Sequence, residues 1–243
     1  MTCLKSLGLV WETRARSKAD MGWLIAIILL VSLMVIGHVN ARADWGGMHI
    51  NWLDGWTRLI CRHLHGLKST QIALPDTGPA IVVANHVSGL DPLLLIAASQ
   101  RPLRFLIASE EYHRPVLHWI FRLAGCIPVD RKGRPETALR AARRALERGE
   151  VIALFPHGKI HLDTDPPRPI KGGVIRLAVW ADAPIYPVRI DGVKAQGKVF
   201  IAPFTPDKVT LTLHPSIRVN DDEPKMTIQR IVNAIEMPTV KQP

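Results

Sequence analysis

Short apolar runs alternate with longer helical patterns from residue 80 onward, and this alternation restricts the fold more than any other feature of the chain. The runs typical of strands are AIVVA (80–84), LRFLIA (103–108), CIPVD (126–130), VIALF (151–155), IYPVRI (185–190), KVFIA (198–202) and VTLTLH (209–214). Helical patterns cover 91–99, 115–124, 135–148, 173–181 and 225–235. Strands that alternate with helices form a largely parallel sheet. The predicted fold class is α/β, with a mostly parallel or mixed central sheet flanked by helices.

A charge-free segment, GWLIAIILLVSLMVIG at residues 22–37, precedes this domain. With His38 and Val39 it nearly reaches the roughly 20 residues that a helix needs to cross a bilayer. Basic residues before it favour a cytoplasmic N-terminus. The alternative is a secretory signal that ends at Ala41-Arg42-Ala43. We expect a membrane anchor, and the cleaved signal stays open as the other interpretation of residues 1–43.

The next segment, residues 44–67, has the pattern of an amphipathic helix. Trp45, Trp52 and Trp56 recur at helical spacing with other apolar residues, whereas Asp54 and Arg58 fall largely on the other side. Tryptophans on an apolar face favour a helix that lies in the membrane interface. An ordinary helix packed on the domain is the alternative. We therefore expect a membrane-binding helical pair before the α/β domain.

The stretch ANHVSGLDP (84–92) follows the first predicted strand and places a histidine five residues before an aspartate. Binding sites in α/β sheets gather beyond the carboxyl ends of strands. Taken alone, Asp91 and Pro92 predict a helix start, with Asp91 as the N-cap and Pro92 at the first helical position. The chemical interpretation is that Asp91 accepts a hydrogen bond from one nitrogen of His86. The other nitrogen then removes a proton from an acceptor hydroxyl. One carboxylate can serve both purposes.

Four sequence blocks resemble the motifs of the glycerolipid acyltransferases, the 1-acylglycerol-3-phosphate acyltransferase-like (lysophosphatidate acyltransferase-like) family. NHVSGLDP resembles the Asn-His-x-x-x-x-Asp motif of that family. Three further blocks resemble the later motifs of the family, in the same order: GCIPVDR (125–131), FPHGK (155–159) and PIKGGVIRLAVWADAPIYPVRI (169–190). The resemblance covers about residues 67–215. It implies an acyltransferase domain at 67–243, preceded by a tail, a hydrophobic membrane helix and an interfacial amphipathic helix within 1–66.

The resemblance also implies roles for individual residues. His86 would be the general base, and Asp91 its partner, in O-acyl transfer from acyl-CoA or acyl carrier protein to the hydroxyl of a lysolipid such as 1-acylglycerol-3-phosphate. Arg131 would bind the phosphate of the acceptor, and Lys171 would supply a second positive contact. From the residues alone, Arg131 is a solvated loop arginine and Lys171 a lysine beside a helix. No cofactor is implied beyond the thioester co-substrate.

The third block departs from the family pattern in the loop that contacts the acceptor. The usual glutamate is His157 and the usual threonine is Lys159, whereas Gly158 is kept and would allow close backbone approach. The family glutamate is associated with recognition of glycerol phosphate, and a histidine cannot act as an anionic acceptor. The predicted substrate-binding residues are thus Arg131, His157, Gly158, Lys159 and Lys171. Either the acceptor differs from lysophosphatidate, or the variant is tolerated with the ordinary acceptor.

The same loop suggests a different class of protein. The loop holds His157, His161, Asp163 and Asp165, and its H-x-x-x-H-x-D pattern would suit a metal ion on a helix. Gly158 and the prolines at 166, 167 and 169 predict a loop instead, so we expect no metal site. A metal-dependent hydrolase and a non-catalytic lipid-binding protein are the alternatives to acyl transfer.

Lysine and arginine outnumber aspartate and glutamate, for a net charge of +10. This charge suits lipid headgroups, a phosphate-bearing substrate or an acidic carrier protein, and no nucleic-acid-binding motif accompanies it. The expected partners are therefore lysolipid and acyl thioester substrates, membrane lipids and, as one donor, acyl carrier protein, but not nucleic acid. We expect the chain at the inner (cytoplasmic) membrane, with the catalytic domain on the cytoplasmic side. The donor, the acyl chain length and the oligomeric state stay open.

Overall fold

The computed structural model describes residues 3–68, 70–115, 117–131, 133, 135–219 and 224–237; of residues 3–20 and Met48 it describes the backbone alone. Its strands are β1 (Ala80–Ala84), β2 (Leu103–Ala108), β3 (Ile127–Val129), β4 (Val151–Leu154), β5 (Ile185–Asp191) and β6 (Thr210–Leu213). They form one sheet in the order β3-β2-β4-β1-β5-β6. Neighbouring strands are parallel, except that β5 and β6 are antiparallel. The predicted α/β class with a mixed central sheet is confirmed.

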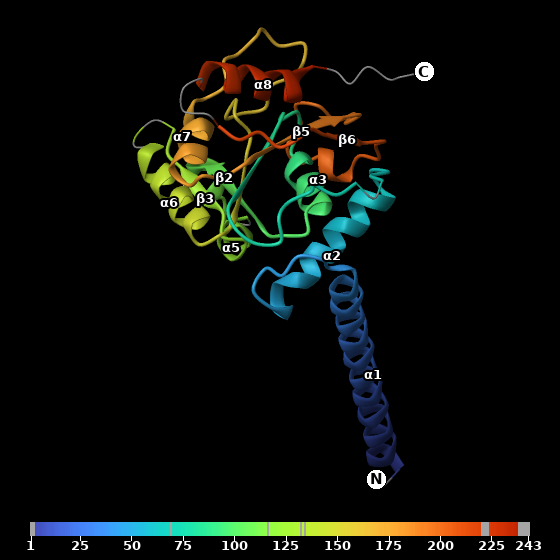
Figure 1. The fold of residues 1–243 in the computed structure, drawn as a ribbon. Coiled ribbons are helices and arrows are strands. Elements are labelled where there is room, and N and C mark those ends of the chain that lie inside the picture. Colours follow the sequence, from blue (N-terminus) through green and yellow to red (C-terminus); the bar gives the residue numbers. More distant parts are fainter. Residues whose placement is uncertain are drawn as a thin grey trace.

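Helices cover both faces of the sheet (Figure 1). All five residues of β1 are buried, because successive side chains of a strand point to opposite faces and both faces are covered here. Ala80 and Val82 belong to the core beneath α3 (Asp91–Ala98). Ile81 and Val83 belong to the core beneath α6 (Pro135–Glu147), α7 (Gly173–Trp180) and α8 (Pro224–Glu236). The short helices α4 (Ser109–Tyr112) and α5 (His118–Leu123) follow β2.

The first two helices, α1 (Cys3–Asn40) and α2 (Met48–His63), form a pair from which α1 projects away from the sheet (Figure 1). The part Met21–Asn40 is long and apolar enough to cross a membrane. The helices cross closely, since a Cβ atom at Gly55 would lie only 1.7 Å from the carbonyl oxygen of Gly37. The indole of Trp56 donates a hydrogen bond to the Leu33 carbonyl at 2.9 Å. The pair is therefore held together by backbone contact and by a side-chain hydrogen bond.

One predicted strand is wrong. Within residues 198–202 no strand forms: residues 199–201 are bends that lead into a 3-10 turn, η1 (Ala202–Phe204). The amide of Gly89 donates to the carbonyl of Lys198 at 3.0 Å, so this segment bonds to a loop instead of a neighbouring strand. Its apolar side chains Val199, Phe200 and Ile201 are exposed. An apolar run with strand spacing can therefore lie on the surface. The other six predicted strands are present.

Candidate active site

The end of β1 is fixed to β5 by the side chain of Asn85. Its amide nitrogen donates to the Ile190 carbonyl at 2.9 Å, and its oxygen accepts from the Ile190 amide at 2.7 Å. Asn85 is buried, so these bonds satisfy both of its polar groups in the interior. The sequence places Asn85 in the motif but does not reveal this contact. The bond pair sets the position from which the next residue, His86, leaves the sheet.

His86 and Asp91 form a hydrogen-bonded pair at the carboxyl end of β1. The imidazole Nδ1 of His86 lies 2.7 Å from Oδ2 of Asp91. Because an ionised carboxylate only accepts hydrogen bonds, Nδ1 carries the proton and Nε2 is the ring nitrogen able to accept one. The His86 side chain is 19% exposed and that of Asp91 is fully buried. The His86 imidazole is therefore accessible to a bound molecule, whereas its carboxylate partner is shielded from water.

The carboxylate of Asp91 accepts three further hydrogen bonds. The amides of Val87 and Ser88 donate to Oδ2 at 2.6 and 2.8 Å, and the Ser88 hydroxyl donates to Oδ1 at 2.9 Å. The predicted N-cap position is wrong by one residue, because helix α3 begins at Asp91 and Leu90 is its N-cap. The preceding loop folds back over the helix start, and its amides then reach the carboxylate. This arrangement holds Asp91 in one orientation toward His86.

The loop 155–161 supports His86 from a second side. The ring of Phe155 stacks on the imidazole with centroids 4.1 Å apart and an interplanar angle of 14°. The amide of His161 donates to the carbonyl of His86 at 2.8 Å. Phe155 follows β4 directly, and His86 lies just after β1, the neighbouring parallel strand. The two rings therefore meet at the same edge of the sheet. The imidazole is thus held by Asp91 at its edge and by Phe155 at its face.

A pocket of about 640 Å³ lies beside Phe155, between the sheet and helices α6 and α7. Most of its lining is apolar, and it brings together three residues predicted to bind substrate: Arg131, Gly158 and Lys171. Gly158 has a φ of +74°, and a Cβ atom there would lie 2.9 Å from Nζ of Lys171. Glycine therefore permits both the turn and the approach of the lysine. The lining holds three cations, Arg131, Lys171 and Arg176, and one carboxylate, Glu136. An apolar pocket with this excess of positive charge suits an amphiphile with an anionic head.

The other two predicted binding residues lie differently. Lys159 is exposed and is not part of the pocket wall. His157 is buried, and its Nε2 donates to Oε1 of Glu236 at 2.9 Å, near the end of α8. Its ring stacks on that of His161 at 4.5 Å. Burial lowers the pKa of His157, although the hydrogen bond to Glu236 acts in the opposite direction. The histidine that replaces the usual glutamate therefore contacts the last helix, not the pocket.

Arg189 is a buried residue of the same region that has no signal in the sequence. Its guanidinium contacts Asp191 on β5, Asp163 at 2.7 Å and the Ile235 carbonyl at 2.9 Å. It thereby connects β5, the loop after His161 and the end of α8. Arginine side chains are mostly exposed, and two of these partners, Asp163 and Ile235, are distant in sequence, so sequence patterns do not indicate this role.

Neither metal chemistry nor a cysteine nucleophile has an evident site within the described ranges. In those ranges, no group of three His, Cys, Asp or Glu side chains is arranged to hold a metal ion. Asp163 of the predicted H-x-x-x-H-x-D pattern points to Arg189. Burial raises the pKa of Cys61 to about 12 and that of Cys126 to about 11, so both thiols are protonated at neutral pH. The hydrogen-bonded His86–Asp91 pair is an arrangement that can accept or return a proton.

Known proteins resemble this chain in sequence and in fold. The family model "Acyltransferase" matches residues 66–191. A probable 1-acyl-sn-glycerol-3-phosphate acyltransferase of Mycoplasma genitalium is 38% identical over 121 residues, which are 47% of this chain and 44% of that protein. An N-acylphosphatidylethanolamine synthase of Arabidopsis thaliana is 32% identical over 124 residues, 47% of this chain and 43% of that one. The chain thus spans less than half the length of these two curated relatives.

The fold is similar to a crystal structure from Thermotoga maritima, that of the 1-acyl-sn-glycerophosphate acyltransferase PlsC. The TM-score is 0.61 at 20% sequence identity, and the match covers 86% of this chain and 89% of the other. At this level of identity the likeness establishes the fold, including the arrangement of a sheet with helices on both faces.

Proposed function

The chain belongs to the acyltransferase family, and we propose that it transfers a fatty acyl group from a thioester to the hydroxyl of a lysolipid. The observation that carries the proposal is the His86–Asp91 pair, joined at 2.7 Å beside an apolar pocket whose lining has more cations than carboxylates. A hydroxyl acceptor needs a base, an amphiphile needs an apolar pocket, and an anionic head needs positive charge. All three are side by side at the carboxyl end of the sheet.

In the proposed mechanism, Nε2 of His86 removes the proton of the acceptor hydroxyl while its oxygen attacks the thioester carbonyl. The carbon–oxygen bond forms, and the tetrahedral intermediate then collapses as the carbon–sulfur bond breaks. The imidazolium returns its proton to the leaving thiolate, which restores neutral His86. The buried carboxylate of Asp91 stabilises the transient imidazolium. The enzyme needs no nucleophile of its own and no cofactor beyond the thioester.

The acceptor that we propose is a 1-acylglycerol-3-phosphate or a close relative. Arg131 and Lys171 would bind its phosphate, since both line the pocket. The Mycoplasma genitalium relative is named for the same acceptor. His157 contacts Glu236 instead of the pocket, so the position of the family glutamate offers no carboxylate to the glycerol hydroxyls. We therefore propose weaker discrimination among lysolipid headgroups, with acyl-CoA or acyl carrier protein as the donor.

We propose that the protein acts at a membrane. Met21–Asn40 is apolar enough to enter a bilayer, and its side chains are almost all exposed in the structure. A lysolipid acceptor also resides in the bilayer. We place the catalytic domain on the cytoplasmic side, where acyl-CoA and acyl carrier protein occur. Intact-mass analysis of the mature chain tests this placement, because a chain that begins at Asp44 would refute the anchor.

A direct assay tests the proposed function. Purified protein is incubated with radiolabelled palmitoyl-CoA, or with palmitoyl acyl carrier protein, and with a panel of lysolipids that differ in headgroup. We expect label to appear in the diacyl product of lysophosphatidate and to depend on the thioester. Absence of product with every acceptor would contradict acyl transfer, and activity that a chelator abolishes would favour a metal-dependent hydrolase.

A further inference from the structure

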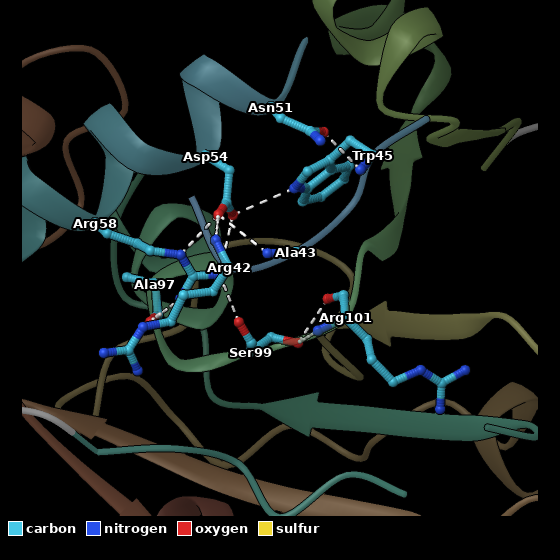
Figure 2. Close-up of polar contacts among 9 residues, drawn as sticks. All are labelled: Arg42, Ala43, Trp45, Asn51, Asp54, Arg58, Ala97, Ser99 and Arg101. Atoms are coloured by element: carbon cyan, nitrogen blue, oxygen red, sulfur yellow. Dashed lines mark hydrogen bonds and ion pairs between the residues drawn. The ribbon is translucent and has the colours of Figure 1, made fainter. Parts of the chain in front are cut away.

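Two charged side chains on α2 are buried at the attachment of the N-terminal helices (Figure 2). Asp54 is 3% and Arg58 is 9% exposed. The guanidinium of Arg58 binds the carboxylate through two bonds, from Nε to Oδ2 at 2.7 Å and from Nη2 to Oδ1 at 3.0 Å. A buried ion pair contributes little net stability compared with apolar packing of the same volume. Such a pair instead fixes the relative orientation of the segments that it joins, because its hydrogen bonds form in only one geometry.

The carboxylate of Asp54 holds the connection between α1 and α2. Its Oδ2 accepts from the amides of Arg42 and Ala43 at 2.8 and 3.3 Å, and its Oδ1 accepts from the indole of Trp45 at 3.2 Å. These donors lie directly after the end of α1 at Asn40. The angle at which α1 leaves the domain is therefore tied to the same carboxylate that binds Arg58 (Figure 2).

The guanidinium of Arg58 holds the end of α3. Its Nη1 donates to the Ala97 carbonyl at 2.8 Å and its Nη2 to the Ser99 carbonyl at 2.6 Å. Carbonyl groups at the end of a helix have no partner within the helix, so an arginine that caps two of them fixes the helix end in position. The hydroxyl of Ser99 in turn bonds to the backbone of Arg101. The contact therefore continues into the catalytic domain.

The opposite end of α3 carries the catalytic carboxylate. Asp91 is the first residue of this helix, and its eight residues span about 12 Å at a rise of about 1.5 Å per residue. One short helix thus connects the acid that orients His86 to the carbonyl groups that Arg58 binds. A change in how α2 sits on α3 changes the direction of α1 relative to the catalytic pair.

We propose that the Asp54–Arg58 ion pair is the joint that sets the orientation of the N-terminal helices relative to His86, so that an acceptor within a bilayer reaches the base. The inference rests on the proposed function and on the proposed membrane anchor. Asp54 and Arg58 are positioning residues, because they act through α1 and α3 and touch no substrate. Apolar contacts of α2 with the core, such as the buried Cys61, also keep the helix attached.

The test compares one acceptor chemistry in two physical states. The variant Arg58→Met keeps the length of the side chain and removes its bonds. Activity is measured with 1-hexanoyl-glycerol-3-phosphate as a monomer in solution and with 1-oleoyl-glycerol-3-phosphate in phosphatidylcholine–phosphatidylglycerol vesicles. We expect unchanged kcat and KM for the soluble acceptor. On vesicles, kcat falls by up to about 100-fold, the loss that a misplacement of about 1 Å can cause.

Two further variants sharpen the result. Arg58→Lys restores the charge but not the forked geometry, so it should rescue vesicle activity only in part. Arg104→Met is the matched control. Like Arg58, Arg104 bonds both to a carboxylate and to a backbone carbonyl: to Glu150 at 2.9 Å and to Ala124 at 3.0 Å. Because Arg104 lies away from α2, Arg104→Met should leave the ratio of vesicle activity to soluble activity unchanged. Equal loss of both activities in Arg58→Met, or an unchanged vesicle activity, would overturn the proposal.

A distance measurement tests the joint without any activity. Spin labels are placed at exposed Val31 on α1 and at exposed Arg140 on α6, with Cys3 replaced by serine and with Cys61 and Cys126 buried. The distance distribution should be narrow in the parent protein and broad or shifted in Arg58→Met. An unchanged distribution would overturn the joint. The two proposals can fail separately. If the parent protein acylates neither acceptor, the proposed function is refuted, and a distance distribution that broadens in Arg58→Met would still support the joint.

Discussion

The charge of Asp91 should matter to catalysis more than its hydrogen bonds, and Asp91→Asn separates the two. Oδ2 accepts from the His86 ring and from the amides of Val87 and Ser88. These three donors require an oxygen at that position, so the asparagine carbonyl must occupy it. The amide nitrogen then faces the Ser88 hydroxyl, which can rotate to accept. The substitution therefore keeps the tautomer and position of His86 and removes only the negative charge.

The size of the effect follows from the geometry of the pair. With Nδ1 and Oδ2 2.7 Å apart, the charges of the imidazolium and the carboxylate are centred roughly 4 Å from each other. Their attraction is then about 4 kcal/mol at an effective dielectric constant of about 20. The imidazolium exists only while the proton is transferred. Asp91→Asn removes the attraction that stabilises it, and this should lower kcat by about 1,000-fold.

The assay is steady-state acylation of lysophosphatidate by the purified variant, with thermal unfolding to confirm the fold. Ser88→Ala is the control, since it removes one hydrogen bond to the carboxylate and keeps the charge. That loss, on the order of 1 kcal/mol, corresponds to only about a fivefold effect. If folded Asp91→Asn retained kcat within about fivefold of the parent protein, the carboxylate charge would not take part in catalysis.

Further expectations concern the acceptor site, the packing of the catalytic loop and pH. Arg131→Ala or Lys171→Ala should each raise KM for lysophosphatidate by about 10- to 100-fold and leave a monoacylglycerol unaffected, because a charged hydrogen bond contributes about 1.5–3 kcal/mol. Gly89→Ala should lower the free energy of unfolding by about 1–3 kcal/mol, measured in urea, because its Cβ would lie 2.0 Å from the Val199 carbonyl oxygen. Burial lowers the pKa of His157 in the folded chain, so the unfolded chain binds more protons and stability should fall as pH drops below about 6.5. Denaturation at several pH values checks this, and His157→Gln should flatten the dependence; a slope of the opposite sign would contradict it.

Much of the fold follows from the pattern of apolar runs, because a strand buried on both faces has to be apolar along its length. Strand β1 illustrates this, since all of Ala80–Ala84 is apolar and buried. The same pattern fails at residues 198–202, where the backbone bonds to the loop at Gly89 and the apolar side chains stay exposed. Periodicity reports the spacing of apolar residues and not what covers them.

The candidate site divides in a similar way. The spacing of His86 and Asp91 predicts their contact because only a short loop separates the end of β1 from the start of α3. The contacts of His157 with Glu236 and of Arg189 with Asp163 and Ile235 join segments that are distant in sequence, and no local pattern specifies them. The same holds for the ion pair on α2, whose residues fall on the polar side of an amphipathic helix but are buried against α3.

The measurement that tests the central claim most directly is the transfer of radiolabelled acyl groups from a thioester to lysophosphatidate by the parent protein and by His86→Ala. We predict labelled diacyl product with the parent protein. With the variant we predict no turnover, while binding of the lysolipid is unchanged because His86 is not among the residues that line the pocket. Undiminished turnover in folded His86→Ala would contradict the assignment of His86 as the base.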